Sequence, residues 1–172
     1  MENKTKWNVD ASHSEVGFKV KHMMISTVKG AFEDFNASVE TENEDFKNAS
    51  FSFTAKVGSI NTKNQDRDTH LKSDDFFNAE KYPELTFTST SYDGNKIVGD
   101  LTIKGITKQV TLDMDFNGVA VDPYGQTKAG FEISGKISRK DFGLTWNAVT
   151  EAGSIVVSDT IQMAIDLQFI KH

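Results

Sequence analysis

The chain has no cysteine and only two prolines among its 172 residues. Without cysteine it has no disulfide framework, no thiol nucleophile and no thiolate metal site, which fits a reducing compartment. No apolar run approaches the roughly 20 residues of a membrane-spanning helix, and no apolar signal region follows the first methionine. We therefore expect a cytoplasmic protein, or a periplasmic one if a leader has been removed.

Basic charge is also scarce, because 19 lysines and arginines face 25 aspartates and glutamates, a net charge of −6. Nucleic-acid binding requires a basic stripe, so this balance argues against a nucleic-acid partner. It also argues against steady attachment to an anionic bilayer, leaving at most transient membrane contact. The chain is rich instead in phenylalanine, with 13 residues, a large apolar load for its size.

Apolar residues recur at every second position along most of the chain, as in strands that are wet on one face. The alternation changes phase at residues 10–14 and again at 33–34, which predicts a bend or bulge at each place. Turn sequences at residues 92–95 and 122–125 join neighbouring strands. The pattern predicts eight antiparallel strands.

Eight such strands bury their apolar faces either in a sandwich or in a closed barrel, and consecutive hairpins favour the barrel. We predict an all-β fold: a single eight-stranded up-and-down antiparallel barrel forming one domain over residues 1–172. Strands of about ten residues make it tall, so an inner tunnel is favoured over a filled core. Gly30, Gly99 and Gly135 lie on the inward rows, where we expect them to leave space.

One short charged segment interrupts the alternation and predicts an α-helix near residues 66–73, with Asn64 as its cap. Arg67, His70 and Leu71 then share one helix face. A single helix between two halves of a β chain either lids the barrel or crosses its surface and covers an open sheet end.

A series of motifs runs in order from the first strand to the last. They are Trp7-Asn8-Val9-Asp10, His13-Ser14-Glu15-Val16, Gly30-Ala31-Phe32, the segment 64–87, Gly99-Asp100-Leu101-Thr102-Ile103, Asp141-Phe142-Gly143 after Arg139, Trp146, and Val156-Val157 before Asp159 and Ile161. In this order they resemble the signature of the YceI-like, or polyisoprenoid-binding, family. The resemblance implies an extended, lipocalin-like barrel whose apolar tunnel holds a polyisoprenoid, an isoprenoid quinone or another long-chain lipid. It also implies that some members are exported, that homodimers occur, and that there is no settled catalytic chemistry.

The inward apolar rows and the helical segment supply candidate tunnel-lining residues, although each of them taken singly could instead be plain core. The candidates are Phe18, Val20, Phe32, Phe51, Phe53, Leu71, Phe76, Phe87, Leu101, Ile103, Met114, Phe131, Ile133, Met163, Ile165 and Leu167.

A lipid head group needs polar partners at one end of such a tunnel. The candidates are Asn64, Arg67, His70 and His22, each of which could instead be a surface ion pair or a satisfied polar group at the barrel end. Asp159 shares the apolar parity of the last strand. It is either an inward acid paired with Arg139 or Arg67, or a bulge residue that faces water.

Catalytic and metal signatures are missing from the sequence. Four histidines occur without HxH or HExxH spacing, so we expect no metal site and no cofactor. The serines near histidines lack a GxSxG elbow, so we expect no enzyme. Three classes of function remain: a lipid-binding or carrier protein, which we favour; an enzyme acting on an isoprenoid or quinone-type lipid; and a structural or interaction barrel with a filled core.

Overall fold

The computed structural model describes residues 4–146 and 157–172; Val156, quoted in the last motif above, lies outside them. The described elements are β1 (Thr5–Val9), η1 (Ala11–His13), β2 (Glu15–His22), β3 (Ser26–Phe32), β4 (Phe35–Thr41), β5 (Ser50–Lys56), η2 (Val57–Ser59), β6 (Ile60–Asn61), α1 (Gln65–Lys72), β7 (Glu84–Tyr92), β8 (Lys96–Ile103), β9 (Ile106–Val121), β10 (Thr127–Ser138), η3 (Arg139–Phe142) and β11 (Val157–Lys171).

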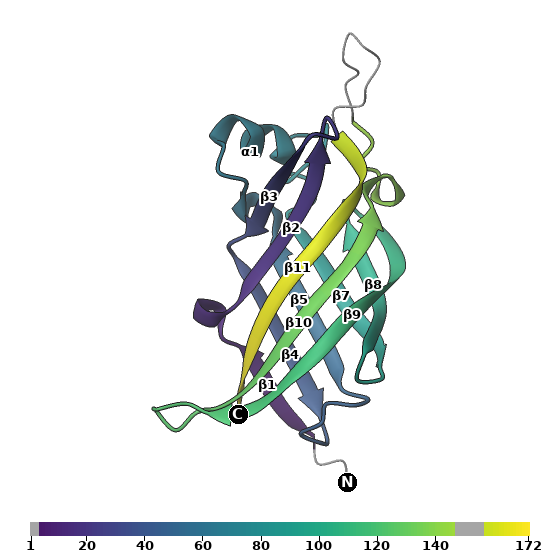
Figure 1. Cartoon of the computed structure of the whole chain (residues 1–172). Helices are drawn as coiled ribbons and strands as arrows, with labels where there is room; N and C mark the ends of the chain where they lie inside the picture. Colours follow the sequence, from purple (N-terminus) through teal and green to yellow (C-terminus); the bar gives the residue numbers. More distant parts are fainter. Residues whose placement is uncertain (1–3, 147–156) are drawn as a thin grey trace.

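The strand segments form one closed, eight-stranded antiparallel barrel, as the alternation predicted (Figure 1). β1 and β2 are two halves of one bent strand, interrupted by the 3-10 turn η1. β3 and β4 are likewise separated at residues 33–34, and β5 continues into β6 through η2. The ring closes because β11 pairs with β2 over Val157–Asp166 and with β1 over Phe169–Lys171. Both phase changes in the alternation therefore mark bends of continuous strands.

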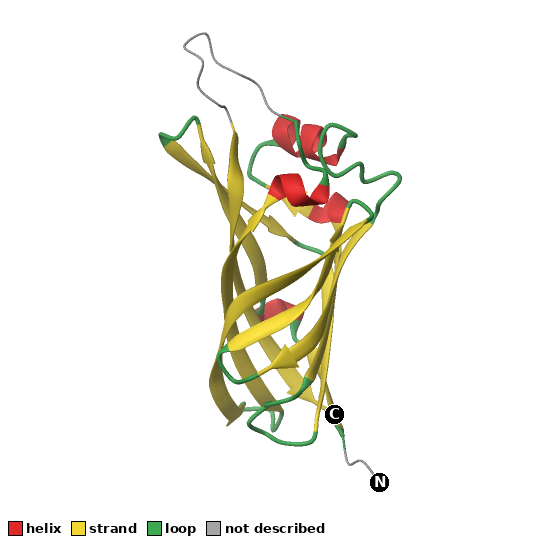
Figure 2. Cartoon of the chain, turned by 90° about the vertical axis from the view of Figure 1, so that its right-hand side faces the viewer, coloured by secondary structure: helices red, strands yellow, loops and turns green. Residues whose placement is uncertain are grey.

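The helix α1 is capped as its sequence indicates, because the Asn64 side chain accepts a hydrogen bond from the Arg67 backbone N–H at 3.0 Å. The helix lies at one end of the barrel, and both chain termini lie near the other end (Figure 1). Figure 2 shows most of the helical segments at the end away from the termini. None of the helices described is long and apolar enough to cross a membrane.

The end of the barrel near the termini is closed by an aromatic plug. Phe46, in the connection between β4 and β5, is fully buried with a positive φ of 60°. Its ring lies 5.1 Å, centroid to centroid, from the rings of Trp7, Phe116 and Phe131. A non-glycine residue keeps this left-handed conformation only where other interactions offset the strain energy. Here the burial of the whole Phe46 ring offsets it.

The inward glycines do not leave empty space, so that expectation is wrong. Large side chains lie over them: a Cβ at Gly30, Gly99 or Gly135 would overlap with Phe18, Phe87 or Leu112 respectively. Each glycine therefore accommodates a neighbouring side chain, and Phe18, Phe87 and Leu112 in turn border the interior of the barrel.

Candidate ligand-binding site

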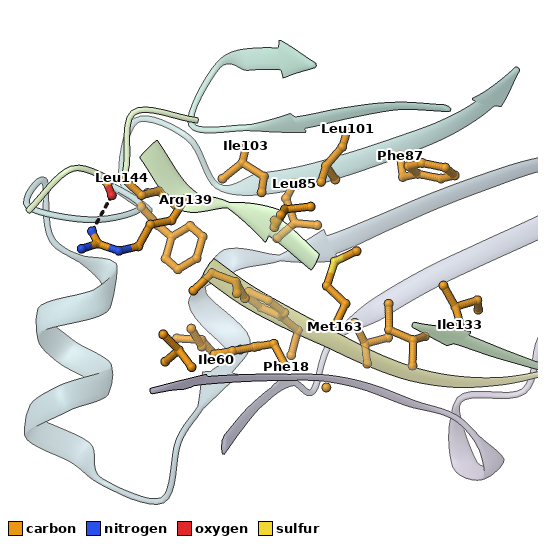
Figure 3. A pocket seen from close by; sticks show the side chains of 18 of the residues that line it. Phe18, Ile60, Leu85, Phe87, Leu101, Ile103, Ile133, Arg139, Leu144 and Met163 are labelled. Atoms are coloured by element: carbon orange, nitrogen blue, oxygen red, sulfur yellow. Dashed lines mark hydrogen bonds between the residues drawn. The ribbon is translucent and has the colours of Figure 1, made fainter. Parts of the chain in front are cut away.

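A cavity of about 370 Å³ occupies the barrel between the aromatic plug and α1 (Figure 3). Its volume lies within the usual range of small-molecule sites. All of the predicted lining residues except Phe131 lie in its wall: Phe18, Val20, Phe32, Phe51, Phe53, Leu71, Phe76, Phe87, Leu101, Ile103, Met114, Ile133, Met163, Ile165 and Leu167. The inward parity of the strands thus brings together residues that are far apart in the sequence.

Phe131 belongs to the plug and not to the wall. It is 1% exposed and contacts Phe46, Phe116 and Phe169 through ring centroids 5.1, 5.2 and 5.7 Å away. Its parity is inward, as expected, but it packs behind the rings of Phe51 and Phe169, which line the cavity and lie 5.5 and 5.7 Å from its centroid. Parity alone does not distinguish these two positions.

Several wall residues near α1 are only half-buried although they point inward. Phe18, Val20, Ile161, Met163 and Ile165 belong to this group. In a solid core such residues would lose almost all of their accessible surface. Here they border space that is left unfilled by the protein, so apolar surface remains for a ligand to cover.

The wall residues that can carry charge gather at the α1 end, and all of them are basic. They are Lys21, His22, Arg67, His70 and Arg139; no aspartate or glutamate from the described part of the chain lines the cavity. In a protein of net charge −6, this end of the cavity is distinctly rich in hydrogen-bond donors.

Arg67 is held by Thr62, which is buried. Its Nε donates to the Thr62 hydroxyl at 2.7 Å and one Nη donates to the Thr62 carbonyl at 2.5 Å. The same hydroxyl donates to the Asp68 carboxylate at 2.5 Å. No carboxylate within residues 4–146 and 157–172 forms an ion pair with Arg67. Thr62 therefore fixes the position of the guanidinium, and no direct ion pair neutralises its charge.

His70 has a carboxylate partner, because its Nε2 lies 2.8 Å from the Asp75 carboxylate. Its ring also meets Trp146 and Phe76 edge-on, with centroids 4.7 and 5.1 Å away. His22 ends β2 at the same rim. Asn64, the fourth head-group candidate, lies outside the cavity, because its side chain is committed to capping α1.

The sequence indicates Arg139 as one of two candidate partners for Asp159, and the structure shows a wider structural contribution. Its Nε and Nη1 atoms donate to the carbonyls of Ser158, Leu144 and Trp146 at 2.9, 2.6 and 2.8 Å. Burial lowers the pKa of its guanidinium, and the charge of Asp159 opposes that shift. Because its donors are used by the backbone, Arg139 ties the turn after β10 to the start of β11.

Asp159 is both paired with a basic residue and located at a strand irregularity, the two alternatives that the sequence offers. Its carboxylate lies 3.7 Å from Arg139 and 3.3 Å from Lys140, so it is paired. It also lies where the register of β11 against β2 shifts, between Val157 and Ile161, and its side chain is partly exposed. Arg67 is not its partner.

A serine, a histidine and an aspartate meet at η1 without forming a catalytic relay. The Ser12 hydroxyl and the Asp10 carboxylate both approach Nδ1 of His13, at 3.1 and 2.8 Å. A relay needs the serine and the acid on opposite ring nitrogens. The Ser12 hydroxyl instead donates to Asp10 at 2.7 Å, in the cap of the turn.

These features define a class: a closed, lipocalin-like β-barrel around an apolar cavity whose polar groups lie at one end. Within that class the chain belongs to the YceI-like domain family, whose model matches residues 7–169.

Three similar proteins cover nearly all of the chain. The UPF0312 protein SA2479 of Staphylococcus aureus strain N315 is 40% identical over 166 residues, which are 96% of this chain and 97% of that protein. The crystal structure of the Campylobacter jejuni YCEI protein is 40% identical with a TM-score of 0.73, covering 94% of this chain and 95% of that one. BcnA of Burkholderia cenocepacia is 26% identical with a TM-score of 0.79, covering 93% and 98%.

A polyisoprenoid binding domain from Saccharophagus degradans has the same fold, with a TM-score of 0.70 over 95% of this chain and 97% of that one. At 15% identity this likeness concerns the fold alone.

Proposed function

We propose that this protein binds and carries a long-chain apolar lipid, such as a polyisoprenoid, an isoprenoid quinone or a similar amphiphile, without catalysing a reaction on it. The tail lies in the barrel cavity and the head group lies at the α1 end. The observation that carries this proposal is the set of inward apolar side chains left half-buried around the cavity.

The chemistry of the wall supports an apolar tail. Burial of apolar surface contributes about 25 cal/mol for each Å² removed from water, and it needs no hydrogen bond from the wall. A dry cavity lined by leucine, isoleucine and phenylalanine accepts apolar guests readily. The wall between Met114 and Phe18 meets these conditions.

The polar end supports a head group that accepts hydrogen bonds. Arg67 lies in the wall with its guanidinium oriented by Thr62, and Lys21 and His22 lie across the rim on β2. Carbonyl, hydroxyl or phosphate oxygens would each find donors there.

The test is mass spectrometry of an organic extract of the protein purified from cells, for wild type and for Met163→Trp. Met163 lies in the middle of the cavity wall opposite Phe18, so an indole there fills the space that the tail needs. Gln162→Trp is the matched control, because Gln162 is the exposed neighbour on the same strand.

We expect a long-chain lipid in the wild-type and Gln162→Trp extracts and at least tenfold less in the Met163→Trp extract, with similar melting temperatures for all three proteins. A wild-type extract without lipid, or equal lipid in the Met163→Trp extract, would overturn the proposal.

A further inference from the structure

The outer wall of the barrel carries two rows of like charge at different heights. Strand pairing places Lys29 opposite Lys19, Lys19 opposite Gln162, and Gln162 opposite Lys136. These residues form a row across β3, β2, β11 and β10, which we call the basic row. In the described chain no carboxylate is paired with any of its three lysines.

The second row, which we call the acidic row, lies four residues further from the α1 end. Glu15 is opposite Asp166, Asp166 is opposite Glu132, and Glu132 is opposite Asp115. At about 3.3 Å per residue the two rows are about 13 Å apart. Like charges directly opposite one another destabilise a sheet, so neither row benefits the fold, and together they polarise the face of the barrel formed by β2, β11 and β10.

The hairpin between β2 and β3 projects from the basic row at the cavity end (Figure 1). Its tip is formed by Met23, Met24 and Ile25, which are 37%, 69% and 82% exposed. The two methionines both have positive φ, 51° and 60°, in a turn closed by a hydrogen bond from Ile25 N–H to the His22 carbonyl. Turns of this kind favour Asn-Gly, so local conformation does not explain the methionines.

The hairpin carries no acidic residue between Val16 and Phe32, although acids outnumber basic residues in the chain as a whole. This order of side chains matches the layers of an anionic bilayer. The exposed methionines and isoleucine of the tip can reach the hydrocarbon, while the unpaired lysines behind them contact the negatively charged head groups. The part of the rim near α1 differs from the β2–β3 hairpin in charge, because it exposes the acidic side chains of Asp66 and Asp74.

We propose that the β2–β3 hairpin docks the protein on an anionic lipid bilayer. The tip enters the interface, the basic row faces the anionic head groups, and the acidic row points away from them. This orientation places the rim residues His22 and Lys21 at the membrane surface, where a lipid can pass between bilayer and cavity. The last step rests on the proposed function, whereas docking itself does not.

The chain contains its own control at the opposite end. The β9–β10 hairpin exposes Val121 and Tyr124, 67% and 90% exposed. Its lysine, Lys128, is paired with Asp10 and Asp122, unlike the lysines of the basic row, so this hairpin should not engage an anionic bilayer.

The experiment is flotation of the full chain with two kinds of vesicle. One is made of phosphatidylcholine alone, and the other of phosphatidylcholine with about 30% phosphatidylglycerol. We expect flotation only with the anionic vesicles, and loss of it at about 0.5 M salt because screening weakens surface charge. Replacing Met23-Met24-Ile25 by Asn-Gly-Ser suits the turn and should reduce vesicle affinity about tenfold. Lys19→Gln with Lys29→Gln should reduce it about fivefold for each lysine.

Two control variants distinguish docking through the β2–β3 hairpin from nonspecific adsorption to vesicles. Val121→Ser with Tyr124→Ser removes the exposed large apolar side chains of the hairpin at the other end. Lys6→Gln with Lys47→Gln removes the same charge near the closed end. Both should float like wild type. Equal flotation with neutral vesicles, an equal loss in either control, or a tip variant that changes only the oligomeric state in size-exclusion chromatography would overturn the proposal. Extracted lipid without flotation would overturn docking while leaving lipid binding intact.

Discussion

The ring of Phe18 lies on Gly30, its direct partner across β2 and β3. A Cβ at Gly30 would overlap with the edge of that ring and would also come within 2.9 Å of Thr62 Cγ2. An aromatic ring that covers a cross-strand glycine is a recurrent way to fix register in curved sheets. Phe18 also borders the cavity, so this contact links the curvature of the barrel to the shape of the site.

Replacing Gly30 by Ala should push the Phe18 ring toward the cavity. We expect a loss of about 1–3 kcal/mol in the free energy of unfolding, as for overpacked sites, and less lipid retained on purification. Urea unfolding and lipid extraction measure the two effects. In a Phe18→Ala background, Gly30→Ala should cost much less unfolding free energy, because the effects of two residues in contact are not additive. Additive effects would contradict the contact.

Aspartate substitutions should separate the plug from the wall. Phe131→Asp places a carboxylate in the closed aromatic plug, where desolvation is costly, and we expect loss of the folded barrel. Phe53→Asp places it in the half-buried wall, and we expect a folded protein that retains no lipid. Circular dichroism melting and lipid extraction measure the outcomes. Equal unfolding by both variants would contradict the division between plug and wall.

Truncating the plug should lengthen the cavity. Phe46→Ala removes a fully buried ring and should cost about 3–5 kcal/mol in unfolding free energy. The space that opens borders Phe131, whose ring contacts the cavity floor at Phe51 and Phe169, so the Phe131 ring can move away from the cavity into it. We therefore expect the variant to favour longer tails than wild type, measured by competition between lipids with one head group and different tails. An unchanged preference would contradict a floor formed by the plug.

The tail should determine affinity more than the head group does. Each additional methylene contributes about 0.8 kcal/mol on burial, whereas an exposed ion pair at the rim contributes about 0–1 kcal/mol. Affinity should rise with tail length, and Arg67→Ala should weaken binding about tenfold at most. Lys63→Ala, in the exposed segment before α1, is the control. Affinity that ignores tail length and collapses in Arg67→Ala would show that the head group governs recognition.

Asp10 should make stability depend on pH. Its carboxylate accepts hydrogen bonds from Lys128 at 2.8 Å, from Ser12 at 2.7 Å and from His13 at 2.8 Å, and these donors, Lys128 foremost, lower its pKa well below the usual value. A lowered pKa stabilises the fold at pH values above the unfolded pKa of about 3.9, and this stabilisation is lost as the pH falls further.

Asp10→Asn should therefore cost about 1–2 kcal/mol at pH 7, and the difference from wild type should shrink as the pH falls below about 4. Urea unfolding at several pH values measures it, with the exposed Glu42→Gln as control. A difference that does not change with pH would show that Asp10 acts by shape and not by charge.

Local patterns in the sequence determined the elements and their inward sides. Period-2 alternation placed Phe18, Leu101 and Met163 in one wall, because a side chain's side of a strand depends only on its parity. The phase changes at residues 10–14 and 33–34 marked real bends, and Asn64 marked the helix cap. These features depend on neighbours within a few residues, so the sequence alone suffices to predict them.

The tertiary structure decided the height of each residue in the barrel. Phe131 and Ile133 have the same parity, yet one lies in the plug and the other in the wall, because Phe46 arrives from a loop far away in the sequence. Lysines scattered through the sequence form the basic row only because the register of β2, β3, β10 and β11 brings Lys19, Lys29 and Lys136 to one level. Register is fixed by the stagger at which the whole ring closes, and that closure depends on all eight strands together.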